Sequence, residues 1–419
     1  MNLTHRKTCR VCGSYSLTKV IDLGEQYLQG FFVKPGQITP TEKKFPTSLV
    51  LCRPLKDKKA CGLLQMEFSI PPEILYSVYW YRSGINNTMR MHLGNIANDA
   101  AEIIGKAKAL VLDIGCNDGT LLNSYPKEFK KIGIDPSNIA KSIQGDIKVV
   151  EDFFPSKKLA NVIQEERCDI ITSIAMFYDL ENPIEFTKAI KNILAPTGIW
   201  ILEMSYMPTM LKTNSYDTIC HEHLEYYSLI VIEYILKQAG LKIFNATLNT
   251  INGGSLRCYV THENNLIYQK DEYMKNIQKI FQEESTLELN TEKPYKDFQD
   301  RITIHKKELN ALLKKLKSEG KKIHIYGAST KGNTILQWCE IDNKTIDVAA
   351  ERNPDKFGAF TLGTNIPIVS EKESRVLKPD YYLVLPWHFK EEFIEREKET
   401  LNKGIGLIFP LPQVEIVTK

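Results

Sequence analysis

The stretch VLDIGCNDGT, residues 111–120, decides the fold of this chain of 419 residues. An apolar run leads to Asp113, and a turn with Gly115, Asn117 and Gly119 follows. This order predicts a buried strand, a tight turn and the start of a helix. It departs from the dinucleotide fingerprint G-x-G-x-x-G, because Asn117 stands where the second glycine would be. The turn therefore suits a ligand other than a dinucleotide.

Apolar runs of strand length recur on both sides of a charged helical stretch at about 265–319. The first series is ALVLDIGC, KKIGIDP, IKVVEDF, CDIITSIAMF and GIWILEM, and the second is KKIHIYGA, TIDVAAERNP, PDYYLVLPW and GIGLIFPLP. Helix-length segments separate the runs, which predicts βαβ units and parallel sheets. We therefore expect an α/β chain with two Rossmann-like domains, preceded by a small domain rich in cysteine, glycine and proline.

The turn and the strand ends after it suit S-adenosylmethionine (SAM). SAM has an amino-acid tail and a sulfonium but no phosphate, so an acid at the strand end and a close backbone approach favour it over a pyrophosphate. Asp135 ends the next strand and is placed to accept both ribose hydroxyls. The candidate cofactor-binding residues are Asp113, Gly115, Asn117, Asp135, Phe153 and Ala175. The alternative is a nicotinamide-dependent dehydrogenase, which also has an acid after its second strand.

Composition and charge exclude several classes of protein. Hydrophobic residues make up 43% of the chain and charged residues 25%, which is too apolar for a disordered protein. The net charge of +3 gives no support for nucleic-acid binding. The sequence has no apolar run of membrane-spanning length and no signal peptide at its start, MNLTHRKTCRVCG. We therefore expect a cytoplasmic protein without a membrane partner, and we expect a monomer.

Four of the nine cysteines lie within the first 61 residues: Cys9, Cys12, Cys52 and Cys61. In a reducing compartment such a cluster predicts a metal site before disulfides. Cys9 and Cys12 form a knuckle for one side of a tetrahedral ion, and Cys52 and Cys61 can supply the other side. Four thiolates leave no open coordination position, so the sequence predicts a structural zinc. The alternative is four free or buried cysteines.

His221, Glu222 and His223 follow one another in the segment YDTICHEH (216–223). One histidine alone is more often a core or surface group than a catalyst, but this chain has only eight histidines. A second metal site is the weaker interpretation, and a general base is the better one, because imidazole titrates near neutral pH. Neighbouring side chains of an extended segment point in opposite directions, so we expect Glu222 and His223 to face different partners.

The segment IHIYGASTKGNT (323–334) predicts a strand, a turn and a helix start in the second α/β series. Gly327 and Gly332 have the spacing of a P-loop, but Lys331 precedes the second glycine, so the Walker motif is absent. The turn can still offer N–H groups to a diphosphate, with Lys331 as a positive charge. Glu351 ends the next strand and would lie near a ribose. The alternative is a Rossmann-like domain that binds no ligand.

Taken together, these motifs resemble the sugar C-methyltransferase family, the SAM-dependent C-3′-methyltransferases of deoxysugar biosynthesis. The matching motifs are CRVCGS (9–14), WYRSG (80–84), VLDIGCNDGT (111–120), GIDPS (133–137), YDTICHEH (216–223), NGGSLR (252–257), YGASTKGNT (326–334) and RNPDKFG (352–358). The resemblance implies a zinc-binding domain at 1–75, a Rossmann-like class I SAM methyltransferase domain at 76–262, and a C-terminal Rossmann-like domain at 263–419 that helps to bind a nucleotide-sugar. The implied cofactors are SAM and a structural Zn²⁺.

The resemblance also implies the reaction and the residues that perform it. A base removes the proton next to a keto group, and the enolate attacks the methyl group of SAM. The implied substrate is a 4-keto-6-deoxy sugar on thymidine or guanosine diphosphate (dTDP or GDP), methylated at C3. The family's base maps onto His223, its neighbouring acid onto Glu222 and its active-site tyrosine onto Tyr81. The candidate substrate-binding residues are Asn252, Ser255, Lys331, Glu351 and Arg352.

Two positions depart from the family pattern. Cys220 stands where well-studied members carry a tyrosine, and Tyr178, a further catalytic candidate, stands where some members carry a histidine. Both departures lie near the expected sugar and bear on its stereochemistry or substituents. Two other functions remain as alternatives: an O-methyltransferase, which needs no base for a carbon, and a zinc-containing scaffold or RNA-binding protein with a vestigial SAM fold.

Overall fold

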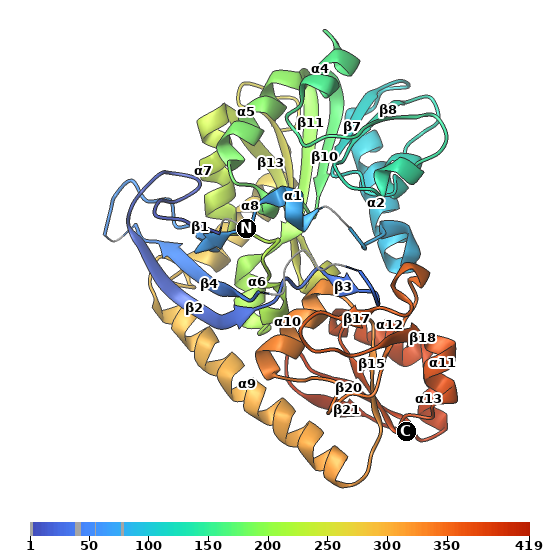
Figure 1. Ribbon diagram of the computed structural model, residues 1–419. Coiled ribbons are helices and arrows are strands. Elements are labelled where there is room, and N and C mark those ends of the chain that lie inside the picture. The colour runs from blue at the N-terminus through green and yellow to red at the C-terminus, as the bar shows by residue number, and fades with distance from the viewer. Residues whose placement is uncertain (1–2, 38–42, 55, 77–78) are drawn as a thin grey trace.

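The computed structural model describes residues 3–37, 43–54, 56–76 and 79–419, and a seven-stranded sheet forms the core of its central domain, in the upper half of Figure 1. The order of this sheet is β13-β14-β11-β10-β7-β8-β9. The strands are β7 (Leu110–Ile114), β8 (Lys130–Ile134), β9 (Ile147–Val150), β10 (Cys168–Ile174), β11 (Leu194–Ser205), β13 (Leu241–Asn249) and β14 (Ser255–His262). β14 is antiparallel to β11 and β13, and the other neighbouring strands are parallel. The sheet confirms the predicted α/β fold class.

Helices cover both faces of this sheet because its central strands are apolar on both sides. On one face, α2 (Asn87–Ile104) packs with α3 (Thr120–Asn123), and on the other α5 (Pro183–Ile193) packs with α7 (Leu229–Ala239). α2 begins where the Asn86 side chain accepts a hydrogen bond from the N–H of Thr88, and it ends at Gly105 in the left-handed conformation. The shorter helices are α4 (Lys157–Ile163) and α6 (Met207–Lys212).

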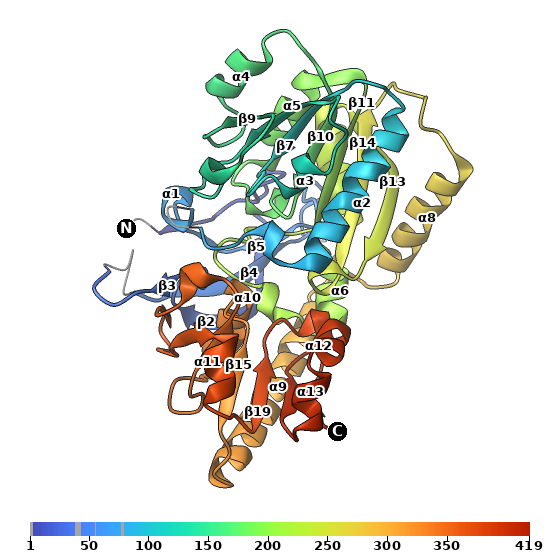
Figure 2. The same cartoon turned by 90° about the vertical axis from the view of Figure 1, so that its right-hand side faces the viewer.

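Helix α8 (Asp271–Ser285) packs on the central sheet, although the sequence analysis assigned residues 263–419 to the C-terminal domain. Tyr268, just before the helix, stacks on Phe244 of β13 with ring centroids 4.7 Å apart. Ile277 and Ile280 of α8 join the core of the central domain. Figure 2 shows α8 beside β13. Helix α8 therefore packs with the central domain, although it follows the predicted boundary at residue 262.

The N-terminal sheet includes a strand from the central domain. Its antiparallel order is β12-β5-β4-β2, with β2 (Leu17–Gln26), β4 (Phe45–Cys52), β5 (Leu64–Met66) and β12 (Glu225–Tyr226). β12 follows directly on the segment with His221, Glu222 and His223. Two smaller pairs are β1 (Thr4–His5) with β6 (Phe68–Ser69), and β3 (Phe32–Val33) with β17 (Phe360–Thr361) of the C-terminal domain. The N-terminal domain, which ends near α1 (Pro72–Leu75), thus contacts both larger domains.

The C-terminal domain has a six-stranded sheet of order β18-β16-β15-β19-β20-β21. Its strands are β15 (Ile323–Tyr326), β16 (Ala349–Glu351), β18 (Ile368–Ser370), β19 (Tyr381–Val384), β20 (Gly406–Phe409) and the antiparallel β21 (Glu415–Val417). In chain order this is the doubly wound arrangement 3-2-1-4-5-6. Such sheets bind ligands at the carboxyl ends of their strands, where the strand order reverses. That point lies between β15 and β19.

Five helices complete the C-terminal part. They are α9 (Lys293–Ser318), α10 (Thr330–Cys339), α11 (Glu371–Val376), α12 (Lys390–Arg396) and α13 (Lys398–Asn402). α9 has 26 residues and runs from the central domain along β2 to the far end of the C-terminal domain (Figure 1). Within the described ranges, none of the helices combines the length and hydropathy needed to cross a membrane.

Candidate active site

One cavity of about 740 Å³ joins the central domain to the C-terminal domain. It contains almost all site residues predicted from the sequence outside the cysteine cluster. These are Tyr81, Asp113, Gly115, Asn117, Asp135, Phe153, Ala175, Tyr178, Glu222, His223, Asn252, Lys331, Glu351 and Arg352. Ser255 is the exception, because its buried hydroxyl donates to the carbonyl of Ile251, 2.9 Å away, and does not line the cavity. Ser255 therefore holds the turn before β14 and lies behind the wall.

The turn after β7 forms the cofactor side of the cavity. Gly115 has a φ of 75°, and a Cβ there would lie 3.2 Å from Cγ of Met176. The two oxygens of Asp135 accept hydrogen bonds from the N–H of Asn117 (2.9 Å) and the N–H of Ser137 (2.7 Å). A carboxylate oxygen has a second lone pair, so Asp135 can still accept hydrogen bonds from a ribose. Asp135 thus shapes the turn and also faces the cavity.

Asp113, Phe153 and Ala175 flank this turn. The Asp113 carboxyl accepts a hydrogen bond of 2.6 Å from Thr172, and burial raises its pKa to about 7. A neighbouring ammonium group, such as that of an amino-acid ligand, would lower this pKa again. Phe153 follows β9 and is 40% exposed, which leaves its ring free to cover a flat ligand. Ala175 follows β10 with a φ of 55° and its N–H bonds to the carbonyl of Glu203.

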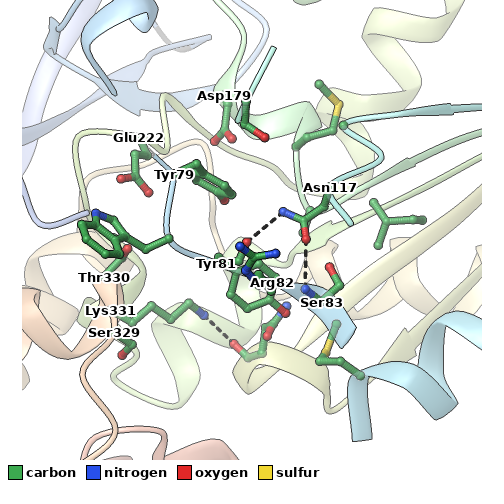
Figure 3. Close-up of a pocket in the computed structure, with 18 of the residues that line it drawn as sticks. Tyr79, Tyr81, Arg82, Ser83, Asn117, Asp179, Glu222, Ser329, Thr330 and Lys331 are labelled. Atoms are coloured by element: carbon green, nitrogen blue, oxygen red, sulfur yellow. Dashed lines mark hydrogen bonds between the residues drawn. The ribbon is translucent and has the colours of Figure 1, made fainter. Parts of the chain in front are cut away.

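Glu222 is a buried carboxyl group on the cavity wall, 8% exposed. It lies against the backbone of Gly30, where a Cβ would be only 1.8 Å from Oε1 of Glu222. Burial raises its pKa to about 7, and none of the described residues hydrogen-bonds to its carboxyl group. Figure 3 shows it opposite Asp179, with Tyr79 between them. Glu222 therefore exchanges a proton near neutral pH.

His223 also lines the cavity, and one of its ring nitrogens makes a hydrogen bond. Nδ1 lies 2.7 Å from the carbonyl oxygen of Thr218. A carbonyl only accepts, so Nδ1 carries the proton and Nε2 keeps the lone pair. Burial and the positive charge of Lys331 lower the pKa of His223 to about 3, so the ring is neutral at pH 7. Its ring packs on Tyr178 with centroids 4.3 Å apart.

His221 has a structural role. Its Nδ1 lies 2.7 Å from Oε1 of Gln29, and its Nε2 lies 3.3 Å from the hydroxyl of Thr47. Both partners come from the N-terminal domain. Glu222 and His223 share no hydrogen bond, in keeping with their alternation along the chain, but both reach the same cavity. Cys220, which was expected near the sugar, is fully buried and is not part of the cavity wall.

Strand pairing connects the four-cysteine cluster to the segment 216–223, here called the catalytic segment because it contains the predicted base. The four Sγ atoms of the cysteine cluster lie within 4.8 Å of one another, with 3.5 Å between Cys12 and Cys52 and 3.6 Å between Cys9 and Cys61. Tetrahedral zinc with Zn–S bonds of about 2.3 Å needs sulfur atoms roughly 3.8 Å apart, so the cluster fits the ion. None of the nine cysteines forms a disulfide. Cys52 ends β4 and Cys61 precedes β5, the strand that pairs with β12.

The turn after β15 forms the opposite side of the cavity. Ser329 caps helix α10, accepting from the N–H of Gly332 at 3.0 Å. Glu351 accepts from the N–H groups of Ala328 (2.9 Å) and Asn353 (3.0 Å), so it braces this turn as Asp135 braces the turn after β7. The turn and its cap resemble a phosphate cradle at a helix N-terminus.

Two charged residues lie at the margins of this side. Lys331 donates to the carbonyl of Asn252 at 2.7 Å, which brings its ammonium group toward the catalytic segment (Figure 3). Arg352 lies at the rim and pairs with Glu371, with Nε 3.1 Å from the carboxylate. Lys331 is therefore better placed than Arg352 to act near the reacting part of a ligand.

Residues 79–86, here called the strap, cross the cavity between the two sides. The Asn117 side chain donates to the carbonyl of Tyr81 and accepts from the N–H of Ser83, both at 3.0 Å (Figure 3). The Asn353 side chain donates to the carbonyl of Trp80 at 2.9 Å. The strap therefore touches the turn on the cofactor side and the turn on the C-terminal side.

The cavity wall also includes polar residues that the sequence did not single out, among them Tyr79, Asp179 and His388. Asp179 follows β10 at the sheet edge shared with the turn after β7, and that position is a signal that sequence reasoning could have used. Tyr79 precedes the WYRSG motif directly. His388 follows β19, at the point where the order of the C-terminal sheet reverses.

Comparisons with known proteins agree with this three-part organisation. Family models match for a zinc binding domain at residues 9–76, a methyltransferase domain at 92–245 and a C-methyltransferase C-terminal domain at 250–412. The chain is 26% identical to C-methyltransferase NovU of Streptomyces niveus over 423 residues, which covers 98% of this chain and 96% of that protein.

Solved methyltransferases align with about two fifths of the chain. A SAM-dependent methyltransferase from Clostridium acetobutylicum aligns with a TM-score of 0.33 at 13% identity, over 41% of this chain and 92% of that chain. Magnesium protoporphyrin IX methyltransferase from Synechocystis aligns with a TM-score of 0.33 at 14% identity, over 42% of this chain and 88% of that chain.

Proposed function

Since this chain belongs to the SAM-dependent C-methyltransferases with a structural zinc, we propose that it methylates a nucleotide-linked 4-keto-6-deoxy sugar at C3. The observation that carries the proposal is the single cavity that contains the turn after β7, the pair Glu222 and His223, and the turn after β15. A cofactor and a nucleotide can enter it from opposite sides, with the proton-transferring groups between them.

His223 is the proposed base. SAM supplies an electrophilic methyl group, and a sugar carbon attacks it only after losing a proton to become an enolate. The hydrogen bond from Nδ1 to Thr218 leaves the Nε2 lone pair as the proton acceptor. The lowered pKa keeps the ring in its neutral, proton-accepting form at pH 7. The proton from C3 moves to Nε2 and leaves to water after the methyl group has been transferred.

The cofactor is proposed to lie over Gly115. In this placement the carboxyl of Asp113 faces the amino-acid tail and Asp135 accepts from the ribose. Phe153 and Ala175 would cover the adenine and the sulfonium side. Support comes from the buried carboxyl groups of Asp113 and Asp135 and from the open approach at Gly115, which a Cβ would narrow against Met176.

The nucleotide is proposed to lie against the turn after β15. The capped N-terminus of α10 suits a diphosphate, and Glu351 suits a ribose hydroxyl. Lys331 would lie between the diphosphate and the reacting sugar. These features suit a dTDP-linked and a GDP-linked sugar alike.

Glu222 is the competing base, because burial raises its pKa to about 7 and a stronger base removes a carbon-bound proton more readily. Deuterium uptake at C3 separates the two candidates. Wild type, His223→Asn and Glu222→Gln would be incubated in heavy water with dTDP- and GDP-linked 4-keto-6-deoxyhexoses. We expect His223→Asn to lose exchange and to lower turnover by about 10²–10⁴-fold, with SAM affinity retained.

Exchange that persists in His223→Asn and disappears in Glu222→Gln would move the base to Glu222. A wild-type enzyme that binds SAM but neither exchanges nor methylates these sugars would contradict the proposed substrate class. Methylation of an oxygen without exchange would instead identify an O-methyltransferase.

A further inference from the structure

Asp179 is a carboxyl group on the cavity wall to which the mechanism above gives no role. It ends the short 3-10 helix Phe177–Asp179, directly after β10. β10 is the neighbour of β7 in the sheet, so Asp179 lies at the same edge as the cofactor turn, on the side where the methyl acceptor enters. Figure 3 shows its carboxyl group beside Tyr79 and opposite Glu222.

Within the described residues, no cation pairs with the carboxyl group of Asp179. Its Oδ1 and the hydroxyl of Tyr76 are both buried without a hydrogen bond of regular geometry, although Tyr76 lies close enough to lower the pKa of Asp179 as a donor. Two neighbouring acids, by contrast, do have a counter-charge. Nε of Arg10 lies 3.4 Å from the carboxylate of Glu181 and 3.8 Å from that of Glu225. A buried carboxyl group without such a partner avoids ionisation.

Two cationic side chains on the cavity wall, Lys331 and Arg82, bind partners other than Asp179. Lys331 donates to the carbonyl of Asn252, and Arg82 pairs with Asp355 at 3.1 Å. The titratable groups within electrostatic range of Asp179 are Tyr76, Tyr79, Tyr178, Cys220, Glu222, Glu225 and Tyr226. None of these groups carries a positive charge, and among them Tyr76 alone favours the ionised form of Asp179, as a hydrogen-bond donor. Burial and the charge of Glu222 raise the pKa of Asp179 well above its usual range.

The reaction needs a hydrogen-bond donor where the enolate oxygen becomes negative. Tyr81 is a weaker acid, because it carries a phenol, and its side chain is 47% exposed. Glu222, with a pKa near 7, is ionised in about half of the molecules at neutral pH. A carboxylic acid kept neutral by its surroundings is a stronger donor than a phenol, and an ionised carboxylate at this point would repel the enolate.

We propose that Asp179 stays neutral in the enzyme and donates a hydrogen bond to the keto oxygen of the sugar while the enolate forms. This inference rests on the proposed function. The C3–H bond breaks with its proton going to His223, the carbon forms a bond to the methyl group, and the sulfur–methyl bond breaks. The proton of Asp179 bridges to the oxygen during the step and stays on Asp179 when the ketone returns.

Two substitutions at Asp179 test this role. Asp179→Asn keeps the shape and an N–H donor but cannot ionise, whereas Asp179→Ala removes the donor. At pH 7 we expect Asp179→Asn to keep kcat within about fivefold of wild type and Asp179→Ala to lose roughly 10²–10³-fold, the usual effect of removing one such donor. Glu185→Gln, an exposed carboxyl on α5 outside the cavity, is the matched control and should behave as wild type.

A pH profile from 6 to 9.5 gives a readout that a purely structural role would not move. Asp179 donates only below its own pKa, so kcat of wild type should fall as the pH rises through that value, and Asp179→Asn should lack this fall. The inference is overturned if Asp179→Asn is as inactive as Asp179→Ala while both bind SAM as wild type does, or if Asp179→Ala is fully active. Failure of the wild type itself to exchange deuterium or methylate the keto-sugars would overturn the proposed function, and the inference with it.

Discussion

The contact between Gly30 and Glu222 joins the N-terminal domain to the catalytic segment through two residues. A Cβ at Gly30 would overlap Oε1 of Glu222, so Gly30→Ala must displace the carboxyl group. We expect Gly30→Ala to lower kcat by roughly 10–100-fold, because small displacements of a catalytic group have effects of this size. SAM affinity, measured by calorimetry, should not change.

Gly94→Ala is the control for this substitution. Gly94 lies inside α2, and a Cβ there would lie 3.9 Å from Oγ of Ser124, an ordinary contact. Alanine should leave kcat unchanged and stabilise the helix by up to about 1 kcal/mol. Equal activity of Gly30→Ala and Gly94→Ala would show that the position of Glu222 does not matter for turnover.

Asp135 gives a second prediction for a single side chain. Asp135→Ala removes the acceptor for two backbone N–H groups and for the proposed ribose contact. SAM binding should weaken by roughly 1–3 kcal/mol in isothermal titration, the cost of hydrogen bonds to a charged group left unmade. Asp135→Asn retains one acceptor oxygen and should lose less. Unchanged affinity in Asp135→Ala would mean that the cofactor lies elsewhere.

Some residues of the cavity wall could be predicted from the sequence, and others could not. Asp113, Gly115 and Asp135 could be identified because strand, turn and strand follow one another within a short stretch. The burial of Glu222 could not be predicted, since it depends on Gly30 from another domain. The position of Asp179 after β10 was a weak signal, because one acid after a strand is common in loops. Ser255 was wrongly included among the residues facing the cavity, because a motif shows neighbours in sequence and not which side chain faces inward.

At the scale of elements, β12 is held in place from the zinc-binding domain by Arg10. The Arg10 guanidinium donates to the Met66 carbonyl (2.7 Å) and to the Gln65 side chain (3.1 Å), and its Nε lies 3.8 Å from Glu225 of β12. Arg10→Met would remove the cation that favours the ionised form of the fully buried Glu225, whose pKa burial raises. We expect the free energy of unfolding, measured in urea, to fall by up to about 3–5 kcal/mol.

The double variant Arg10→Met with Glu225→Gln serves as the check on this explanation. Glutamine carries no charge to desolvate, so the double variant should recover part of the lost stability. A double variant as unstable as Arg10→Met alone would mean that the hydrogen bonds of Arg10 to β5, and not its charge, hold the strand.

The elements themselves could largely be predicted, but their neighbours could not. Period and length reveal α8 as a helix, and Ile277 and Ile280 mark its apolar face. Nothing in that face tells which of the two sheets it covers, so the packing of α8 on the central sheet could not be predicted. β12 has two residues, too short for any alternation to show, and its partner β5 lies far away in the sequence.

At the scale of the whole molecule, the zinc cluster contributes to stability and not to chemistry. Purified protein should contain one zinc per chain, and Cys12→Ser should lose the metal and unfold at a lower temperature in calorimetry. Below that temperature its turnover should stay within roughly tenfold of wild type, because a closed four-thiolate site supplies folding energy and no Lewis acid. Cys168→Ala, at a buried cysteine outside the cluster, should retain its zinc. A metal-free protein as stable as wild type would contradict the assignment.

The strap has a consequence for how the two ligands influence each other. Asn117 binds the strap on the cofactor side of the cavity, and Asn353 binds it on the C-terminal side. A ligand that orders one end of the strap therefore also orders the end that faces the other ligand. Thermodynamic reciprocity then requires that the factor by which SAM tightens the nucleotide equals the factor by which the nucleotide tightens SAM. In Asn353→Ala, the factor for SAM and the factor for the nucleotide should both fall toward a value of one. The two substrates would then bind independently.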